Sequence, residues 1–105
     1  MLQWKGVPDL VGASSMINFI WDLDDDLDGN VQHIAEHDVT PEEVEEVLND
    51  RFSQDTYSKT SGRPMTFGWT DAGRYLAVVW ELVDEDPLTI YPVTAYPARE
   101  PGEER

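Results

Sequence analysis

Residues 40–48 read TPEEVEEVL, and this stretch decides how the chain begins to fold. Thr40 and Glu43 have the spacing of a capping box, and Pro41 stands at the first helical position, where a missing amide donor costs nothing. The apolar residues that follow recur at the spacing of one helix face; they are Val44, Val47 and Leu48. The pattern predicts an amphipathic helix that starts after Thr40 and stops near residue 49 or 50.

Downstream of this helix, segments that alternate in hydrophobicity are separated by turn residues. Residues 65–70 and 74–83 read as strands joined by a tight turn, and residues 88–96 read as a third strand. Residues 51–60 are polar and give a weaker strand signal. Pro92 has no amide to donate, so its strand is expected at a sheet edge or with a bulge there.

Upstream of the helix, residues 17–21 form a short apolar run that predicts a strand, and residues 22–30 form an acidic loop. A short helix is expected next, with Val31, Ile34 and Ala35 on one side. The expected fold class is therefore α+β, with a short N-terminal strand, two helices and an antiparallel meander of three to four strands packed on the helices.

The length and composition of the chain allow one domain. Its 105 residues are 40% hydrophobic, which suffices for a single core. Residues 16–98 are expected to form the domain, residues 1–15 a poorly structured arm and residues 99–105 a flexible tail. Without cysteine there is no disulfide framework and no thiolate metal site. No apolar run approaches the roughly 20 residues of a membrane helix, so a cytoplasmic protein without membrane contact is expected.

The charge of the chain is strongly negative. Twenty-two acidic residues against seven basic ones give a net charge of −15. Such a surface repels phosphate, because nucleic-acid affinity depends on lysine and arginine that neutralise it. Unaided nucleic-acid binding is therefore not expected. The acidity fits a solubilising coat, and it also fits a basic protein partner.

The acidic loop contains the front half of a calcium-binding pattern. Asp24, Asp26 and Asp28 stand at alternate positions before Gly29, and carboxylates so spaced can wrap a hard cation. The twelfth position of the full pattern requires glutamate, and here it is Ala35. Two interpretations stay open: a calcium site, or a solvated acidic turn before a helix N-terminus. No other cofactor is expected.

The letters His33-x-x-Glu36-His37 match an inverted zinc-peptidase motif. The chain is much shorter than the usual scaffold of that chemistry, and the sequence indicates no third ligand. We expect instead that one of the two histidines is half-buried and that the other caps the C-terminal end of its helix. Metal-free RNA cleavage needs an acid–base group and cations, which His37, Lys59, Arg63 and Arg74 provide only if folding gathers them.

The order of these segments resembles the BrnT-type toxin family, a branch of the RelE-like ribonuclease fold, over residues 19–98. Near the start stands Phe19-Ile20-Trp21-Asp22, where the family has an aromatic residue near Trp-Asp. Glu36-His37-Asp38-Val39 stands where the family has Lys-His-Gly-Val. Gly73-Arg74-Tyr75-Leu76-Ala77-Val78-Val79 is similar to the family's Gly-Arg-x-Leu-x-Val-Val, and residues 91–96 occupy the place of its final strand.

The resemblance implies a RelE-like fold and a metal-independent endoribonuclease that an antitoxin neutralises, with His37 and Arg74 as its catalytic residues. The departures fall on cationic positions. Glu36 replaces a lysine, and Tyr91 and Tyr96 replace arginines of the final strand. Losing cations that stabilise a developing phosphorane opposes catalysis.

Three functions remain open on these grounds. The first is a diverged BrnT-like domain with weak or no ribonuclease activity that binds or regulates a protein, the partner being antitoxin-like or basic. The second is an active toxin of a toxin–antitoxin pair. The third is a calcium-binding module built on the acidic loop.

Overall fold

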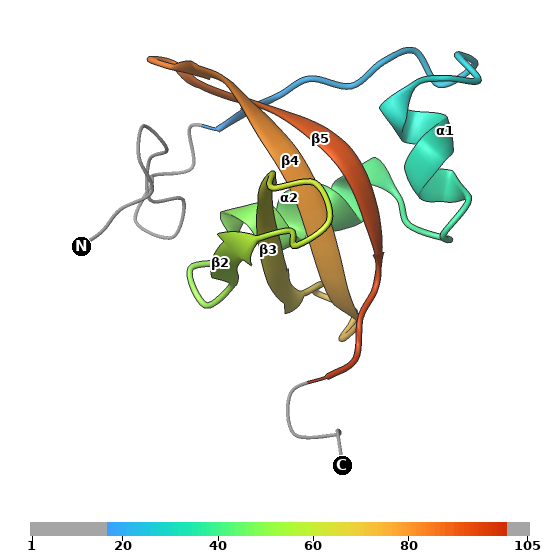
Figure 1. Cartoon of the computed structure of the whole chain (residues 1–105). Helices are drawn as coiled ribbons and strands as arrows, with labels where there is room; N and C mark the ends of the chain where they lie inside the picture. Colours follow the sequence, from blue (N-terminus) through green and yellow to red (C-terminus); the bar gives the residue numbers. More distant parts are fainter. Residues whose placement is uncertain (1–16, 101–105) are drawn as a thin grey trace.

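The computed structural model describes residues 17–100, so the expectations for residues 1–15 and for the end of the tail lie outside the described residues. The elements, in chain order, are β1 (Asn18–Phe19), α1 (Asn30–Ala35), α2 (Pro41–Asn49), β2 (Gln54–Tyr57), β3 (Pro64–Trp69), β4 (Tyr75–Glu85) and β5 (Leu88–Pro97). The α+β class and the predicted order of a strand, two helices and a four-strand meander are confirmed (Figure 1).

The strands form one mixed sheet in the order β1-β5-β4-β3-β2. The meander is antiparallel throughout, whereas β1 pairs parallel with β5 through Phe19 and Ile90. The strand containing Pro92 was expected at the sheet edge or with a bulge there. β5 is the second strand of the sheet, but β1 pairs only with Thr89 and Ile90 and does not reach Pro92. The alternative, a bulge, is confirmed: Val79 pairs with Thr94 and Trp80 with Pro92, which leaves one residue of β5 unpaired between them.

The start of α2 has the geometry that its sequence predicts. The Glu43 amide donates to Thr40 Oγ1 at 3.2 Å, and the Thr40 amide donates to Glu43 Oε1 at 3.1 Å. The helix ends at Asn49, where the prediction placed its end. Beyond it, the buried Ser53 hydroxyl donates to the Val47 carbonyl at 2.7 Å, which satisfies a carbonyl near the helix end.

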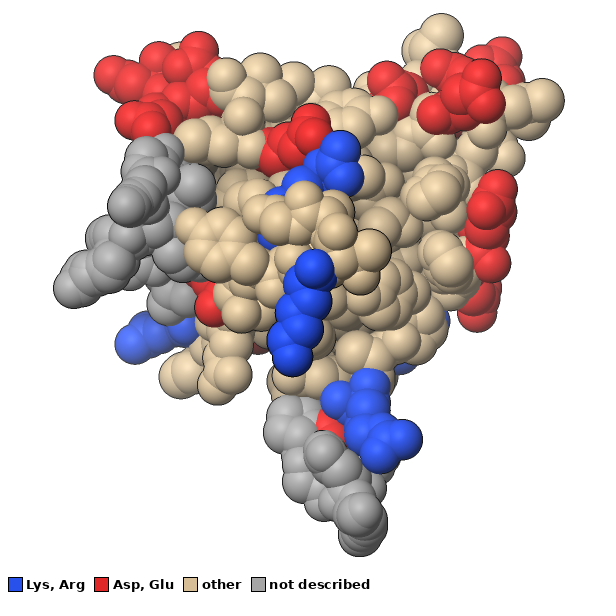
Figure 2. All heavy atoms as spheres, in the orientation of Figure 1, with Lys and Arg blue, Asp and Glu red and all other residues tan. Residues whose placement is uncertain are grey.

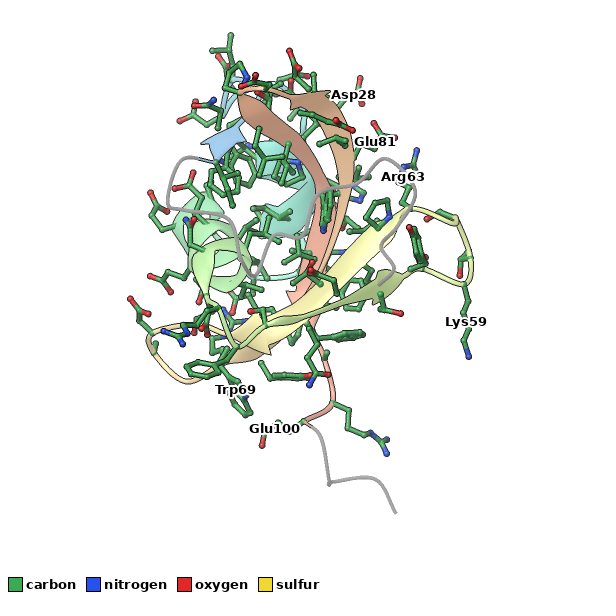
Figure 3. All side chains as sticks on the ribbon, turned by 90° about the vertical axis from the view of Figure 1, so that its left-hand side faces the viewer. Asp28, Lys59, Arg63, Trp69, Glu81 and Glu100 are labelled. Carbon is green, nitrogen blue, oxygen red and sulfur yellow. The ribbon has the colours of Figure 1, made fainter. Side chains whose placement is uncertain are left out.

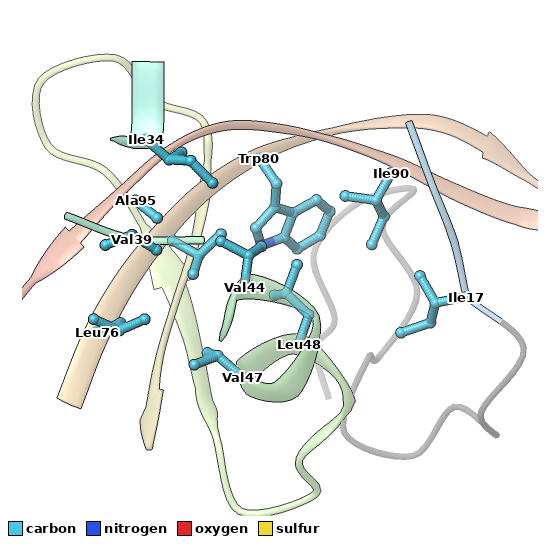
Figure 4. Close-up of a cluster of buried hydrophobic side chains, with 11 residues drawn as sticks. Ile17, Ile34, Val39, Val44, Val47, Leu48, Leu76, Trp80, Ile90 and Ala95 are labelled. Atoms are coloured by element: carbon cyan, nitrogen blue, oxygen red, sulfur yellow. The ribbon is translucent and has the colours of Figure 1, made fainter. Parts of the chain in front are cut away.

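Both helices pack on the same side of the sheet, where they enclose the core (Figure 4). Ile34 of α1 is buried, whereas Ala35 beside it is exposed, so only part of the predicted apolar side of α1 faces inward. Trp80 lies at the centre, and its indole donates to Thr66 Oγ1 at 2.9 Å. The Thr66 hydroxyl donates in turn to Asp55 Oδ1 at 2.7 Å, so the buried polar groups of this row are satisfied.

Helix α2 lies close against β3 because Gly68 has no side chain at the contact. A Cβ atom at Gly68 would overlap the Ser53 hydroxyl and lie 3.1 Å from a methyl group of Val47. The glycine thus lets α2 and the segment after it approach β3 closely on the core side of the sheet. The residues of β3 on either side of Gly68 point to the opposite face.

Candidate functional site

The sheet face opposite the helices is the candidate site, and we call it the open face. It is made of side chains that alternate with core residues along the three long strands. These are Met65, Phe67 and Trp69 of β3, Tyr75, Ala77 and Val79 of β4, and Thr94 and Tyr96 of β5. Within residues 17–100, neither helix covers this face (Figure 1).

Aromatic rings gather at one end of the open face. The rings of Phe67 and Tyr75 stack with centroids 6.1 Å apart, and those of Trp69 and Tyr75 are 4.9 Å apart. Burial by these neighbours raises the pKa of the Tyr75 hydroxyl. Trp69 remains 39% exposed. The cluster is a rigid apolar surface that solvent still reaches.

The composition of the open face differs from that of an ordinary solvated sheet face. Antiparallel sheets with one face in water usually alternate apolar residues inside with polar residues outside. Here the outward positions of β3 and β4 from Met65 to Val79 are aromatic or aliphatic. Ala77 and Val79 are buried at their positions, and Trp69 is the exposed member of the row. Solvent therefore reaches the aromatic end of the face, and an apolar surface that solvent reaches is typical of an interaction site.

A hollow of about 380 Å³ lies on the open face beside the β2–β3 loop. Aromatic and aliphatic side chains form its walls, hydroxyls and one lysine its rim; the lining residues are Thr56, Tyr57, Ser58, Lys59, Thr60, Met65, Phe67 and Tyr96. No acidic residue is among those lining residues, although the chain carries a net charge of −15.

The acidic residues gather away from the middle of the open face. Figure 2 shows lysine and arginine over the middle and lower parts of this face, with most of the acidic side chains at its upper corners and along one side. Lys59 and Arg63 lie on the side of the sheet away from α2 (Figure 3). Arg63 pairs with Glu81 at 2.7 Å, whereas Lys59 forms no ion pair in the part of the chain that the structure describes.

The candidate catalytic residue Arg74 is engaged in a structural contact. Its Nη1 lies 2.9 Å from both carboxylate oxygens of Glu43 and donates to the Asp38 carbonyl, also at 2.9 Å. The same Glu43 carboxylate belongs to the capping box of α2. Arg74 therefore ties the start of β4 to the connection between the two helices, and its charge is already paired.

The candidate catalytic residue His37 lies at the margin of the open face. Its ring is 6.0 Å from that of Tyr96 and 6.1 Å from that of His33, and both histidines are exposed. The expectation of one half-buried histidine is wrong, because α1 turns this side to solvent. Arg74 donates to the carbonyl of Asp38, the residue after His37, so folding brings the two candidates to one corner of the molecule. The Arg74 guanidinium, however, is bonded to Glu43.

Tyr91, which stands where the resemblance places an arginine, is tied to the acidic loop. Its hydroxyl donates to Asp22 Oδ2 at 2.7 Å, which lowers the pKa of Asp22 and raises the pKa of Tyr91 to about 12. Asn30 completes the connection, since its buried side-chain amide donates to the carbonyls of Ile20 and Pro92. These bonds hold the loop against β5.

The structure keeps the three aspartates of the calcium pattern exposed. Asp26 Oδ1 accepts from the Asp28 amide at 3.0 Å, which closes a local turn. Across residues 17–100 there is no group of three or more histidine, cysteine or acidic side chains placed to hold a metal ion.

The other two cations considered for RNA cleavage, Lys59 and Arg63, lie on the open face beside the hollow (Figure 3).

The open face as an apolar surface was missed by the sequence reasoning. A usable signal exists: residues 75–80 read YLAVVW, apolar in both phases of the alternation. Such a run is typical of a strand that is covered on both sides. The described helices cover only one side of this strand, although Ala77 and Val79 on the other side are also buried. The second apolar phase therefore marks the candidate site.

No protein family model matches this sequence, and no curated protein is significantly similar to it. Among the described helices, none has both the length and the apolar character that a membrane crossing requires.

Proposed function

We propose that this chain is a protein-binding module of BrnT-like fold, with weak or no ribonuclease activity, which docks a second protein on the open face. The observation that carries the proposal is the aromatic cluster of Phe67, Trp69 and Tyr75, in which Trp69 is exposed and the other two rings are half-buried, on a sheet face that no described helix covers. Aromatic residues of this kind are the usual energetic centre of protein interfaces.

The charge pattern supports a protein as the partner. A net charge of −15 repels nucleic acid, and it equally repels a second copy of this chain. A partner that is basic around its contact surface is attracted by the acidic side chains at the corners of the open face (Figure 2). This complementarity agrees with the expectation of a basic partner.

The backbone at Asp38 supports the resemblance that underlies the proposed fold. Asp38 has a φ angle of 64°, in the left-handed region that favours glycine. It stands where the family motif has the glycine of Lys-His-Gly-Val. Aspartate tolerates this conformation better than most residues, and the Arg74 bond to its carbonyl helps to hold it.

The positions of the catalytic candidates support weak or absent ribonuclease activity. Stabilising a phosphorane needs a cation that faces the substrate, and Arg74 is bonded to Glu43 instead. Metal-independent RNA cleavage by the purified protein that disappears in His37→Ala would refute this part of the proposal.

Site-specific photo-crosslinking in the native host tests the docking surface. A benzophenone amino acid replaces Trp69 on the open face, and in a matched control it replaces Phe52, which is 79% exposed in the α2–β2 connection. A discrete adduct is expected from the first position and not from the second.

The adduct supports the proposal only after its protein component is purified and its affinity measured. Phe67→Ser is expected to weaken that affinity at least tenfold, as truncation at an interface centre does, and Phe52→Ser to leave it unchanged. Equal adducts from both positions, or an affinity indifferent to Phe67→Ser, overturn the proposal.

A further inference from the structure

The hollow beside the β2–β3 loop indicates what the partner presents. We infer that it receives one large apolar side chain from an extended segment of the partner, and that Lys59 pairs with a carboxylate of the same segment. This inference rests on the proposed function and specifies the chemistry of the partner at its point of closest contact.

The hollow lies between the β2–β3 loop and the side chains of the open face. Residues 56–60 form one wall, and Met65, Phe67 and Tyr96 form the other. Its volume of about 380 Å³ is at the lower end of the range of ligand pockets, about 300–1,000 Å³. A leucine or phenylalanine side chain fits such a space.

The β2–β3 loop that walls the hollow is held by its own hydrogen bonds. The Ser58 amide donates to the Arg63 carbonyl and the Gly62 amide to the Ser58 carbonyl, both at 2.8 Å. Gly62 has a φ angle of 76°, which the turn requires and which glycine adopts without strain. Arg63 also bonds Glu81 of β4. A wall formed before binding lowers the entropy cost of receiving a ligand.

Lys59 selects for a carboxylate. It lines the hollow and pairs with no acidic side chain among residues 17–100, although the chain has 22 acidic residues and only seven basic ones. Glu81 lies nearby but is paired with Arg63, and no acidic side chain lines the hollow, so its one charged lining residue is positive while the molecule as a whole is negative. A partner segment with a carboxylate at its centre and basic residues around it complements both the positive Lys59 at the hollow and the negative charge of the molecule as a whole.

The place of β2 favours an extended segment. β2 is the last strand in the order of the described sheet. Thr56 and Tyr57 of this strand line the hollow. An extended segment that runs beside this strand places one of its side chains over the hollow, as in other complexes in which a peptide lies along a strand.

Small probes test the hollow without a known partner. Hydrocinnamate carries a phenyl ring and a carboxylate; phenylpropylamine carries the ring with the opposite charge, and phenyl phosphate carries it with a phosphate. Each is titrated to about 20 mM against the full chain while amide NMR shifts are followed, because ligands of this size bind in the millimolar range. Saturable shifts at residues 56–60, 67 and 96 are expected for hydrocinnamate and not for phenylpropylamine.

Matched variants assign the charge. Lys59→Met is expected to weaken hydrocinnamate about fivefold, as loss of an exposed ion pair does. Arg51→Met makes the same change of charge at an exposed arginine that stacks on Phe52, and it is expected to leave binding unchanged. Absence of saturable shifts at the hollow, or equal effects of both variants, overturns the inference.

Two further outcomes separate the inference from the proposed function. Tighter binding of phenyl phosphate than of hydrocinnamate overturns the inference in favour of a nucleotide or phosphorylated ligand. A purified partner that needs Phe67 but is indifferent to Lys59→Met overturns the inference and leaves the proposed function standing. A partner indifferent to Phe67→Ser removes the proposed function, whatever the probes show.

Discussion

The contact between Arg74 and Glu43 gives the sharpest test of the distinction between a structural and a catalytic arginine. Two unit charges 2.9 Å apart attract by about 6 kcal/mol near a protein surface, before desolvation and side-chain ordering are subtracted. The Arg74 side chain is 33% exposed and that of Glu43 is 18% exposed, so the pair is partly shielded from solvent. The expected net coupling is about 1–2 kcal/mol.

The variants are Arg74→Met, Glu43→Gln and the double variant, because glutamine keeps the capping box at its third helical position. Arg74→Met also frees the Asp38 carbonyl, so it is expected to cost about 2–3 kcal/mol in total. For a domain of this size that lowers Tm by roughly 10–15 °C. Urea unfolding followed by far-UV circular dichroism measures all three variants.

If Arg74 has a structural role, the losses of unfolding free energy in the two single variants do not add up to the loss in the double variant. The coupling energy between the two residues then exceeds about 1 kcal/mol. An arginine held for catalysis at an open site predicts the opposite: a stability close to wild type and little coupling. A coupling below about 0.5 kcal/mol would refute the structural role and reopen Arg74 as a candidate for substrate contact.

Four other outcomes are expected. Gly68→Ala drives a methyl group into Ser53 and is expected to lower the free energy of unfolding by about 1–3 kcal/mol in urea titration, and an unchanged midpoint would contradict the close approach of α2. Tyr91 donates to Asp22, so its pKa is raised to about 12 from an ordinary value of 10.0, and the unfolded chain ionises first as the pH rises. The free energy of unfolding should therefore fall as the pH rises between these two values. Tyr91→Phe should reduce that slope in thermal melts, and the raised pKa of Tyr75 accounts for a remainder. Thr94 Oγ1 is buried without a hydrogen-bond partner in the described structure, so Thr94→Val is expected to keep or raise stability by about 1 kcal/mol, and a clear loss would reveal a missed partner. Calcium and magnesium at equal millimolar concentration are expected to shift Tm equally, as counterions of an acidic loop; a larger shift with calcium would indicate a specific site.

The elements that the sequence predicted well are those with local causes. Helix α2 depends on contacts between Thr40 and Glu43, three positions apart, and both its ends were predicted. The tight turn before β4 similarly follows from Gly73, whose φ angle is 90°. Local hydrogen bonds and local backbone preferences are encoded within a few residues, which a sequence pattern can represent.

The features that the sequence did not predict depend on contacts between distant segments. Nothing near Phe19 indicates that it pairs with Ile90, so the N-terminal strand was predicted but its parallel pairing with β5 was not. Arg74 was identified as a cation, but its partner Glu43 is 31 residues away. The sequence therefore shows that position 74 carries a positive charge, whereas only the fold shows that this charge is paired with Glu43. For the same reason the two candidates at His37 and Arg74 share a corner without facing one substrate.

The open face illustrates a third case, in which the signal was present and its meaning depended on what covers the strand. The run YLAVVW at residues 75–80 predicts a strong strand whichever face is buried. Whether Tyr75 and Ala77 face the helices depends on the side of the sheet on which the helices pack. The close contact between α2 and Gly68 lies on the opposite side of the sheet from these two residues. A pattern of hydrophobicity alone does not contain this choice.

The pairing of β1 with β5 has a consequence for biosynthesis. The first strand joins the last, and Asp22 meets Tyr91 across 69 residues of sequence. Chains are made from the N-terminus at about 5–20 residues per second. The segment around Phe19 is therefore made several seconds before the β5 residues with which it pairs. During that interval the meander can form from β2 to β4, whereas the Asn30 side chain lacks the Pro92 carbonyl that it later bonds. Closure of the sheet is thus a late event in translation, and a ribosome stalled before residue 88 carries a domain whose two ends have not yet met.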